Sequence, residues 1–500
     1  KTIRLIQSPE EAQNDHQRIY VPIIGMQSKV SKFKDDPNIH IWEYRSGIEY
    51  DNYTLILTHG TTYGVNGLTS QYTICNNLRQ WIGLWKSVGV KIKSHIICSS
   101  MCIFNNAMNA QPDNAFKYTI CNNAFEFLCK GLGLDFSALD VNEDELSYWE
   151  KLASYIDIED FDFDTFVNHR FNTSTLNDVI AFVQTWFEYK DDFSRWLLKT
   201  YYIWKADEHN YLIRVLKKIN SQSTSDLFSQ IATQIFDEAI DDTSLKQRLL
   251  LLNEAKKQNV QITSLAEQRI KAKLSAMAVD PERGPLYAMK YMSPLTSSEM
   301  CLMVEWVGQA KIDKNYIKVL YPELYNYLMP ANIQTDSGNS WINNYFQEYC
   351  ISKVANKPTE CLVNDLEERN ASQVKFETWR NGFKTVKTIL HNRQDIELYY
   401  WIDGLGVDWV PFITKVIEKH KVDGVFLNEI YVAAADLPTI TSINKVKLEE
   451  LAGNKLDKIG DIDKFAHAQK NYPFYIIDEL KIVEEAISQV LSKYNGKKIA

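Results

Sequence analysis

Cysteine and long hydrophobic runs are scarce in this 500-residue sequence. The eight cysteines are irregularly spaced and include no Cys-x-x-Cys pair, which predicts free, mostly buried thiols in a reducing cytoplasm. No stretch reaches the roughly 18 uncharged apolar residues that a membrane-spanning helix needs. The opening KTIRLIQSPEE also differs from a secretory signal, which has a charged and then an apolar segment. We therefore expect a cytoplasmic protein without a membrane partner.

Two nucleotide-binding signatures are missing as well, the GxxxxGK[ST] phosphate loop and the GxGxxG dinucleotide fingerprint. The net charge is −9, from 55 Lys and Arg against 64 Asp and Glu. This balance argues against a surface that binds nucleic acid throughout, although it leaves room for a local basic groove. The hydrophobic fraction of 45% is ordinary for a folded protein, and a chain of this length predicts about two to four domains.

Residues 1–135 are predicted to form an α/β domain. Its β-rich runs are Arg18–Ile24, Ile39–Tyr44, Tyr53–Thr58 and Lys91–Cys98, with one helical pattern at Asn77–Ser87. The hexapeptide YTICNN occurs twice, at Tyr72–Asn77 and Tyr118–Asn123, each time before an apolar, helix-like run. The two copies indicate either a duplicated structural unit or a chance repeat.

Residues 136–393 are predicted to form an all-helical domain. Segments with one apolar face, several of them opened by Ser, Thr or Asp, are Thr175–Tyr189, Asp226–Ile240, Leu245–Lys257 and Ile262–Met277. Aromatic residues are dense here: Trp186, Phe187, Tyr201, Tyr202, Tyr321, Tyr325 and Tyr327. We expect them to fill the interhelical core, with a partner-docking scaffold as the alternative. The acidic run Ile156–Asp164 is expected to be a solvated connection between helices.

Residues 394–500 change character again. The pattern predicts a strand at Ile396–Ile402, a helix at Trp409–Lys419, a second strand at Gly424–Ala433 and an amphipathic helix at Tyr475–Tyr494. The last residues, KKIA, have the pattern of a further strand as it begins. Strands that alternate with helices predict a mostly parallel sheet, which binds ligands at the carboxyl ends of its strands.

Two places in this segment have the residue types of a chemical site. Asp403 directly follows the first strand and precedes two nearby glycines, so its carboxylate is available to a hard or borderline dication; a turn or helix cap is the alternative. Thr441 and Ser442 precede a polar segment where a helix can begin. A helix N-terminus and a cation both favour the alkoxide form of a hydroxyl. Asn444 is placed to donate its amide to a phosphate oxygen, and a helix-capping cluster is the alternative.

Taken together, the strand-end Asp403 and the later Pro438-Thr439-x-Thr441-x-x-Asn444 element resemble the alkaline phosphatase superfamily, and more narrowly the PglZ family. Nucleotide pyrophosphatase/phosphodiesterase relatives carry the same Pro-Thr-x-Thr-x-x-Asn element. The resemblance implies that Asp403 is a metal ligand, that Thr441 is both nucleophile and metal ligand, and that Asn444 contacts the phosphate. Thr439 matches the first threonine of the element, which is not the attacking group.

This motif-level resemblance covers about residues 394–500, which would form the first part of an alkaline-phosphatase-like core. PglZ proteins are associated with bacterial phage-exclusion (BREX) defence. The resemblance therefore implies a phosphoesterase with two divalent metal ions, zinc foremost, acting on a nucleotide or nucleic-acid phosphodiester beside other defence proteins. The alternative is a non-catalytic scaffold that recruits those proteins through the N-terminal and helical domains.

The sequence departs from the family in one respect: it contains no Asp-His-Gly, the motif that completes the family's bimetal site. We expect that motif to lie beyond Ala500, and we expect the 500-residue chain to bind metal weakly and to hydrolyse little. Three other histidine positions are expected not to be metal ligands. They are His59, in Thr58-His59-Gly60, together with His420 and His467.

Overall fold

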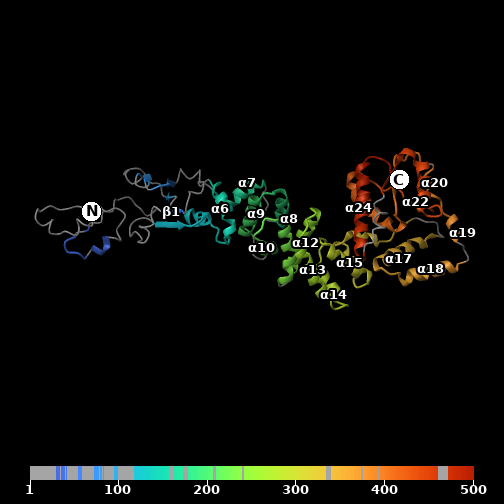
Figure 1. Ribbon diagram of the computed structural model, residues 1–500, viewed down its shortest axis with the longest axis horizontal. Coiled ribbons are helices and arrows are strands. Elements are labelled where there is room, and N and C mark those ends of the chain that lie inside the picture. The colour runs from blue at the N-terminus through green and yellow to red at the C-terminus, as the bar shows by residue number, and fades with distance from the viewer. Residues whose placement is uncertain are drawn as a thin grey trace. The chain divides into compact units, whose positions relative to one another are not determined.

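The computed structural model describes residues 30–33, 35–39, 41, 54–58, 72–77, 79, 80, 83 and 95–98, and 117–500 apart from 157–160, 173–177, 206–209, 239–240, 334–338, 373–375, 392 and 460–470. This part of the chain is mostly helical with a few short strands, and it divides into two compact units, Lys1–Gln222 and Ser223–Ala500 (Figure 1). Among the described residues no helix has both the length and the apolar character needed to cross a bilayer.

The first unit contains a four-stranded, all-parallel sheet. Its strands are β1 (Thr54–Thr58), β2 (Tyr72–Cys75), β3 (His95–Cys98) and β4 (Lys117–Cys121), in the order β2-β3-β1-β4. The strands predicted at Tyr53–Thr58 and Lys91–Cys98 are thus confirmed, the second over its last four residues. The strand predicted at Arg18–Ile24 lies outside the described residues. Most residues of the predicted strand Ile39–Tyr44 and of the predicted helix Asn77–Ser87 also lie outside them.

Both copies of the YTICNN repeat fold in the same way. In each, the Tyr-Thr-Ile-Cys residues form an edge strand of the sheet, β2 in the first copy and β4 in the second. The second asparagine then accepts a hydrogen bond from the backbone N–H three residues on: Gln80 to Asn77 at 3.0 Å, and Glu126 to Asn123 at 2.8 Å. The Gln80 and Glu126 side chains in turn accept from the backbone N–H of the first asparagine of their copy. The two copies therefore share one local structure, a strand followed by the same reciprocal cap.

Removing the second cap is expected to destabilise the first unit. Asn123→Ala deletes the acceptor of the Glu126 N–H at the start of helix α5 (Ala124–Glu126), and loss of such an N-cap costs about 1 kcal/mol. Urea denaturation measures this change. Asn122→Ala is the matched control, because it removes only an exposed side-chain contact to Glu126 and leaves the cap in place. Equal losses in the two variants would contradict the capping role.

Helices complete the first unit. They are η4 (Phe127–Gly131, a π-helix), η5 (Glu143–Glu145), α6 (Leu146–Ala153), α7 (Phe163–Arg170), α8 (Val179–Glu188), α9 (Asp192–Lys205) and α10 (Tyr211–Leu216). The aromatic side chains lie between them: Trp186, Tyr201 and Tyr202 are all buried. This confirms their predicted place in an interhelical core.

The second unit begins with a long helical segment. Its elements are α11 (Thr224–Thr233), η6 (Gln234–Asp237), α12 (Asp242–Lys257), α13 (Ser264–Met277), α14 (Gly284–Ala288), η7 (Met289–Tyr291), α15 (Ser297–Gly308), η8 (Lys314–Ile317), α16 (Pro322–Tyr327), α17 (Trp341–Ala355), α18 (Glu360–Ala371), α19 (Phe376–Asn381) and α20 (Val386–Leu390). Ser223, Asp241 and Thr263 cap α11, α12 and α13 with their side chains, as the sequence predicts. The all-helical character predicted for this region is confirmed over its described residues.

The last part of the second unit contains a small parallel sheet. Its elements are β5 (Tyr399–Ile402), η10 (Val407–Trp409), α21 (Val410–Lys419), η11 (His420–Asp423), α22 (Thr441–Ala452), η12 (Gly453–Lys455), β6 (Leu456–Ile459) and α24 (Phe474–Lys493). β5 pairs in parallel with β6, and Leu398 makes a parallel bridge with Ile499. The predicted helices at Trp409–Lys419 and Tyr475–Tyr494 are confirmed. KKIA, predicted to begin a further strand, makes only the single bridge at Ile499 among the described residues.

The second strand predicted here was wrong. Residues 425–433 have no regular secondary structure, and the first bridge after them joins Ala434 in parallel to Thr385. Phe426 and Tyr431 remain 66% and 59% exposed. A β-rich composition forms a strand only when a neighbouring strand offers its backbone groups and covers its side chains. Within the described residues this segment has no such neighbour, so its apolar side chains stay in solvent.

Six of the cysteines are free thiols, as expected. Cys75, Cys121, Cys129, Cys301, Cys350 and Cys361 are free, and four of these six are buried. Burial raises the pKa of Cys121 and of Cys350 to about 12. Such thiols stay protonated at neutral pH and are poor nucleophiles.

Candidate functional site

The structure brings Asp403 and Thr441 together, although they lie far apart in the sequence. Asp403 follows the carboxyl end of β5, and Thr441 is the first residue of α22. The Thr441 hydroxyl donates a hydrogen bond to Asp403 Oδ1 at 3.2 Å. Thr441 is exposed and Asp403 is half-buried, so the pair is accessible to a ligand. The two candidate side chains therefore meet beside the carboxyl end of β5.

The local sequence explains why the chain turns at Asp403. Gly404 has a φ of 80°, a left-handed conformation that glycine adopts without steric cost. Gly406 allows the Asp408 carboxylate to approach the backbone, because a Cβ at position 406 would lie 2.4 Å from Asp408 Oδ1. The loop then enters η10 and α21, whose Pro411 stands in the first turn, where its missing N–H costs nothing.

Buried contacts hold this loop from the helical side. Tyr327 donates its hydroxyl to Asp408 Oδ2 at 3.0 Å, and the Cys350 thiol contacts the Asp408 carbonyl oxygen at 3.4 Å. Burial raises the pKa of Asp408 above its usual value, while the nearby Lys353 ammonium lowers it. Lys353 itself pairs with Glu479 at 2.6 Å. A buried and hydrogen-bonded carboxylate five residues after Asp403 thus anchors the loop that carries the site.

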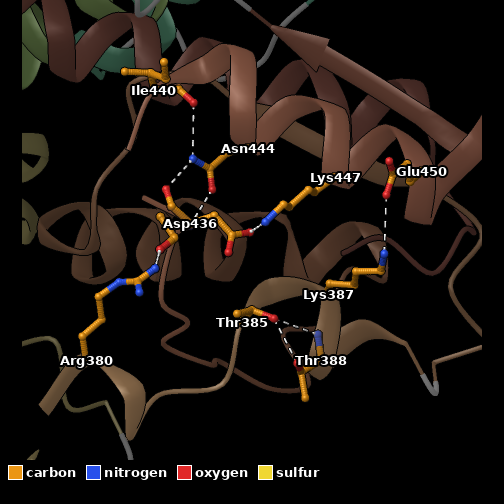
Figure 2. Close-up of polar contacts among 10 residues, drawn as sticks. Arg380, Thr385, Lys387, Thr388, Asp436, Ile440, Asn444, Lys447 and Glu450 are labelled. Carbon is orange, nitrogen blue, oxygen red and sulfur yellow. Dashed lines mark hydrogen bonds and ion pairs between the residues drawn. The ribbon is translucent and has the colours of Figure 1, made fainter. Parts of the chain in front are cut away.

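Asn444 does not face Thr441. Its Oδ1 accepts from the Asp436 N–H at 2.8 Å, while its Nδ2 donates to the carbonyls of Asp436 and Ile440 at 3.0 and 3.3 Å (Figure 2). These bonds occupy both N–H groups of the amide. Asn444 therefore holds the loop that leads into α22, and the phosphate contact remains a prediction that would require these bonds to open. Thr439 is exposed on the same loop.

A shallow groove that the sequence did not indicate lies beside the start of α22. It has a volume of about 480 Å³, and it is lined by Thr385, Lys387, Asp436, Ser442, Ile443, Val446, Lys447 and Glu450. Two ion pairs cross it: Lys447 with Asp436 at 2.9 Å, and Lys387 with Glu450 at 3.5 Å (Figure 2). Ser442 lines the groove while its neighbour Thr441 bonds to Asp403, so the groove and the pair meet at the first turn of α22.

The described residues do not supply a complete zinc site. Asp403 and Thr441 offer two oxygen ligands, whereas zinc in proteins takes three or four protein ligands. Among the residues that the structure describes, no three His, Cys, Asp or Glu side chains are grouped so that they could hold a metal ion. The pair alone does not fit the bimetal centre that the resemblance implies.

The other histidine positions lie away from the pair or outside the described residues. His420 contacts Asp423 and Ser488 rather than Thr441. Thr58 is buried at the end of β1, in the first unit, whereas His59 and His467 lie outside the described residues. In the acidic run, Asp162 caps α7 by accepting from the Thr165 N–H, and residues 157–160 are not described.

Comparison of the chain with protein-family models, with curated proteins and with solved structures gives no match.

Proposed function

We propose that the chain is a PglZ-like phosphoester hydrolase component of a cytoplasmic phage-defence system, with Thr441 as its nucleophile. The observation that supports this best is the 3.2 Å hydrogen bond between Thr441 and Asp403. It joins a hydroxyl at a helix N-terminus to a carboxylate at the carboxyl end of a parallel strand, where α/β proteins bind their ligands.

In the proposed reaction, the Thr441 oxygen attacks phosphorus and its proton passes to the Asp403 carboxylate. The bond from phosphorus to the leaving alcohol breaks, and the alcohol oxygen takes up a proton from solvent. The first N–H groups of α22 favour the negative charge, because the N-cap residue Ile440 has no side-chain acceptor for them. Water then attacks the phosphorus of the Thr441 adduct, and the bond from phosphorus to the threonine oxygen breaks. A diester substrate gives a phosphate monoester as the released product, the Thr441 oxygen regains a proton, and Asp403 returns its proton to solvent.

A divalent metal ion, zinc by the resemblance, belongs to this proposal as a Lewis acid at the phosphoryl oxygens. Because two oxygen donors are too few for a firm zinc site, we expect weak metal binding and slow turnover. The proposed substrates are nucleotide or nucleic-acid phosphodiesters, and the proposed partners are other proteins of the defence system.

The proposal is tested with bis(p-nitrophenyl) phosphate and p-nitrophenyl phosphate, in the presence of Zn²⁺. We expect faster release of nitrophenolate from the diester, and a Thr441 that carries a p-nitrophenylphosphoryl group in the peptide mass spectrum after reaction with the diester. Thr441→Ala should abolish the covalent adduct and lower the rate by at least about a hundredfold, because it removes the attacking oxygen. Ser442→Ala is the matched control and should leave the rate unchanged. An equal rate in Thr441→Ala would remove the nucleophile assignment.

A further inference from the structure

A second hydroxyl of the chain stands in a nucleophile–base–acid arrangement. His420 Nε2 lies 3.2 Å from Ser488 Oγ, and His420 Nδ1 lies 3.1 Å from Asp423 Oδ2. The carboxylate that contacts Nδ1 favours the tautomer with its proton on that nitrogen, which leaves Nε2 free to accept the serine proton. A hydroxyl within hydrogen-bond reach of a base that a third group orients is the pattern of an activated nucleophile.

Three elements assemble this arrangement. His420 begins η11 directly after α21, and Asp423 ends the same short turn, so the two side chains are neighbours through their spacing. Ser488 lies on α24, which packs against α21. One turn earlier on α24, Glu484 pairs with Lys419 at 2.5 Å. This partly exposed ion pair joins the same two helices beside the serine and histidine.

The hydroxyl and its base are accessible but not fully exposed. The His420 side chain is 22% exposed, and Ser488 is half-buried. Asp423, with its side chain 60% exposed, contacts the imidazole from the solvent side. A small electrophile can therefore reach the serine oxygen, while the packing of α21 against α24 holds the imidazole in place.

We propose that Ser488 is a base-activated hydroxyl that is covalently modified by acyl or phosphoryl donors carrying a good leaving group. The serine oxygen forms the new bond to the carbonyl carbon or phosphorus, and its proton moves to His420 Nε2. The bond to the leaving group breaks, and the leaving group departs with its electron pair. Asp423 positions the imidazole through its contact with Nδ1. This site shares no residue with the Thr441 site and does not depend on the function proposed for it.

The position of Ser488 also defines which donors it accepts. Ser488 lies in the interior of a 20-residue helix, where each backbone N–H is bonded to the carbonyl four residues earlier. Such N–H groups are not free to stabilise a developing oxyanion, a contribution worth about a hundredfold or more in hydrolases. The site therefore favours a reactive ester or fluoride over a peptide or a simple ester, and the adduct persists.

The test treats the whole chain with an alkyl fluorophosphonate and locates the adduct by peptide mass spectrometry. Fluoride is the leaving group, and the expected product is a phosphonylated Ser488. His420→Gln should slow the modification by about a hundredfold, because it removes the base. Asp423→Asn should slow it less, since this carboxylate acts only through the imidazole. His391→Gln replaces an exposed histidine elsewhere in the same unit and should leave the rate unchanged.

Each outcome decides the proposal. The proposal is supported if an adduct forms on Ser488 and if its formation slows in His420→Gln. Circular dichroism must then show the same helix content in every variant. Ser488→Ala should abolish the adduct at that position without creating another. Adduct spread equally over exposed serines such as Ser442, or a Ser488 rate unchanged in His420→Gln, would overturn it. Unchanged labelling of Ser488 in Thr441→Ala separates this result from any failure of the Thr441 hydrolase.

Discussion

Lys199→Ala is expected to destabilise the first unit by about 3–5 kcal/mol, because it removes one partner of a buried ion pair and leaves the other charge unpaired. The Lys199 ammonium, on α9, lies 2.6 Å from Glu145 Oε1 and also donates to the Ile219 carbonyl at 2.9 Å. The two side chains are only 6% and 10% exposed. Alanine leaves the Glu145 carboxylate without its cation in a place that water barely reaches. Hydrogen exchange of α6 and α9 measures this loss within the first unit.

A matched control comes from an exposed pair in the same unit. Lys130 and Glu126 are one helical turn apart, and the Lys130 side chain is 55% exposed. Lys130→Ala should therefore cost no more than about 0.5 kcal/mol. The double variant Lys199→Met with Glu145→Leu should recover most of the stability, because no charge is then left unpaired. A Lys199→Ala loss no larger than that of Lys130→Ala would show that burial does not strengthen the pair.

The helices were predictable from the sequence because their signals are local. Each helix has apolar residues at helical spacing within its own segment. The capping residue of α11, α12 and α13 directly precedes the helix: Ser223, Asp241 and Thr263. The parallel strands were less predictable, since a strand depends on partners distant in the chain. The segment 424–433 has the composition of a strand but pairs with no other strand among the described residues. The sequence also did not show that both copies of YTICNN form edge strands with the same cap.

The candidate site was predictable only in part, for a related reason. Asp403 and Thr441 were identified because their residue types follow a strand and precede a helix, and both positions are fixed by the backbone. Asn444 was identified from the same motif, but its amide bonds to the loop at Asp436, and sequence spacing does not show in which direction a side chain points. The role of Asp408 depends on Tyr327, a residue in a different helix, and no pattern within one segment reveals such a contact.

Arg248→Met is expected to destabilise the second unit by about 3–5 kcal/mol. Arg248, on α12, is 1% exposed; its Nε and Nη2 donate to the Ala232 carbonyl at 3.1 and 2.9 Å, and its Nη1 donates to that of Tyr291 at 2.9 Å. Methionine fills part of the volume but leaves both carbonyls without these donors. It also removes the positive charge that acts on the buried Glu299 carboxylate. Hydrogen exchange of α12 and α15 measures the loss.

The same substitution should change how stability depends on pH. Burial raises the pKa of Glu299, whereas Arg248 and the hydrogen bonds from Ser293 and Thr296 lower it, and the net direction is upward. A group with a raised folded-state pKa binds its proton more tightly in the folded protein. Glu299 therefore does not lower the free energy of unfolding below its unfolded-state pKa of about 4.3. It lowers that free energy increasingly as the pH rises through its folded-state pKa.

Without Arg248, the pKa of Glu299 should rise further, so the free energy of unfolding should keep falling to a higher pH than in the wild type. Between the two folded-state pKa values the added slope should reach up to about 1.4 kcal/mol per pH unit. Urea titrations between pH 5 and 8 compare the two slopes. The double variant Arg248→Met with Glu299→Gln has no carboxyl group at position 299. It should therefore lose the added slope, even though it remains less stable than the wild type. If the added slope persists in the double variant, another buried acid causes it, and Asp408, whose pKa burial also raises, is the first to replace.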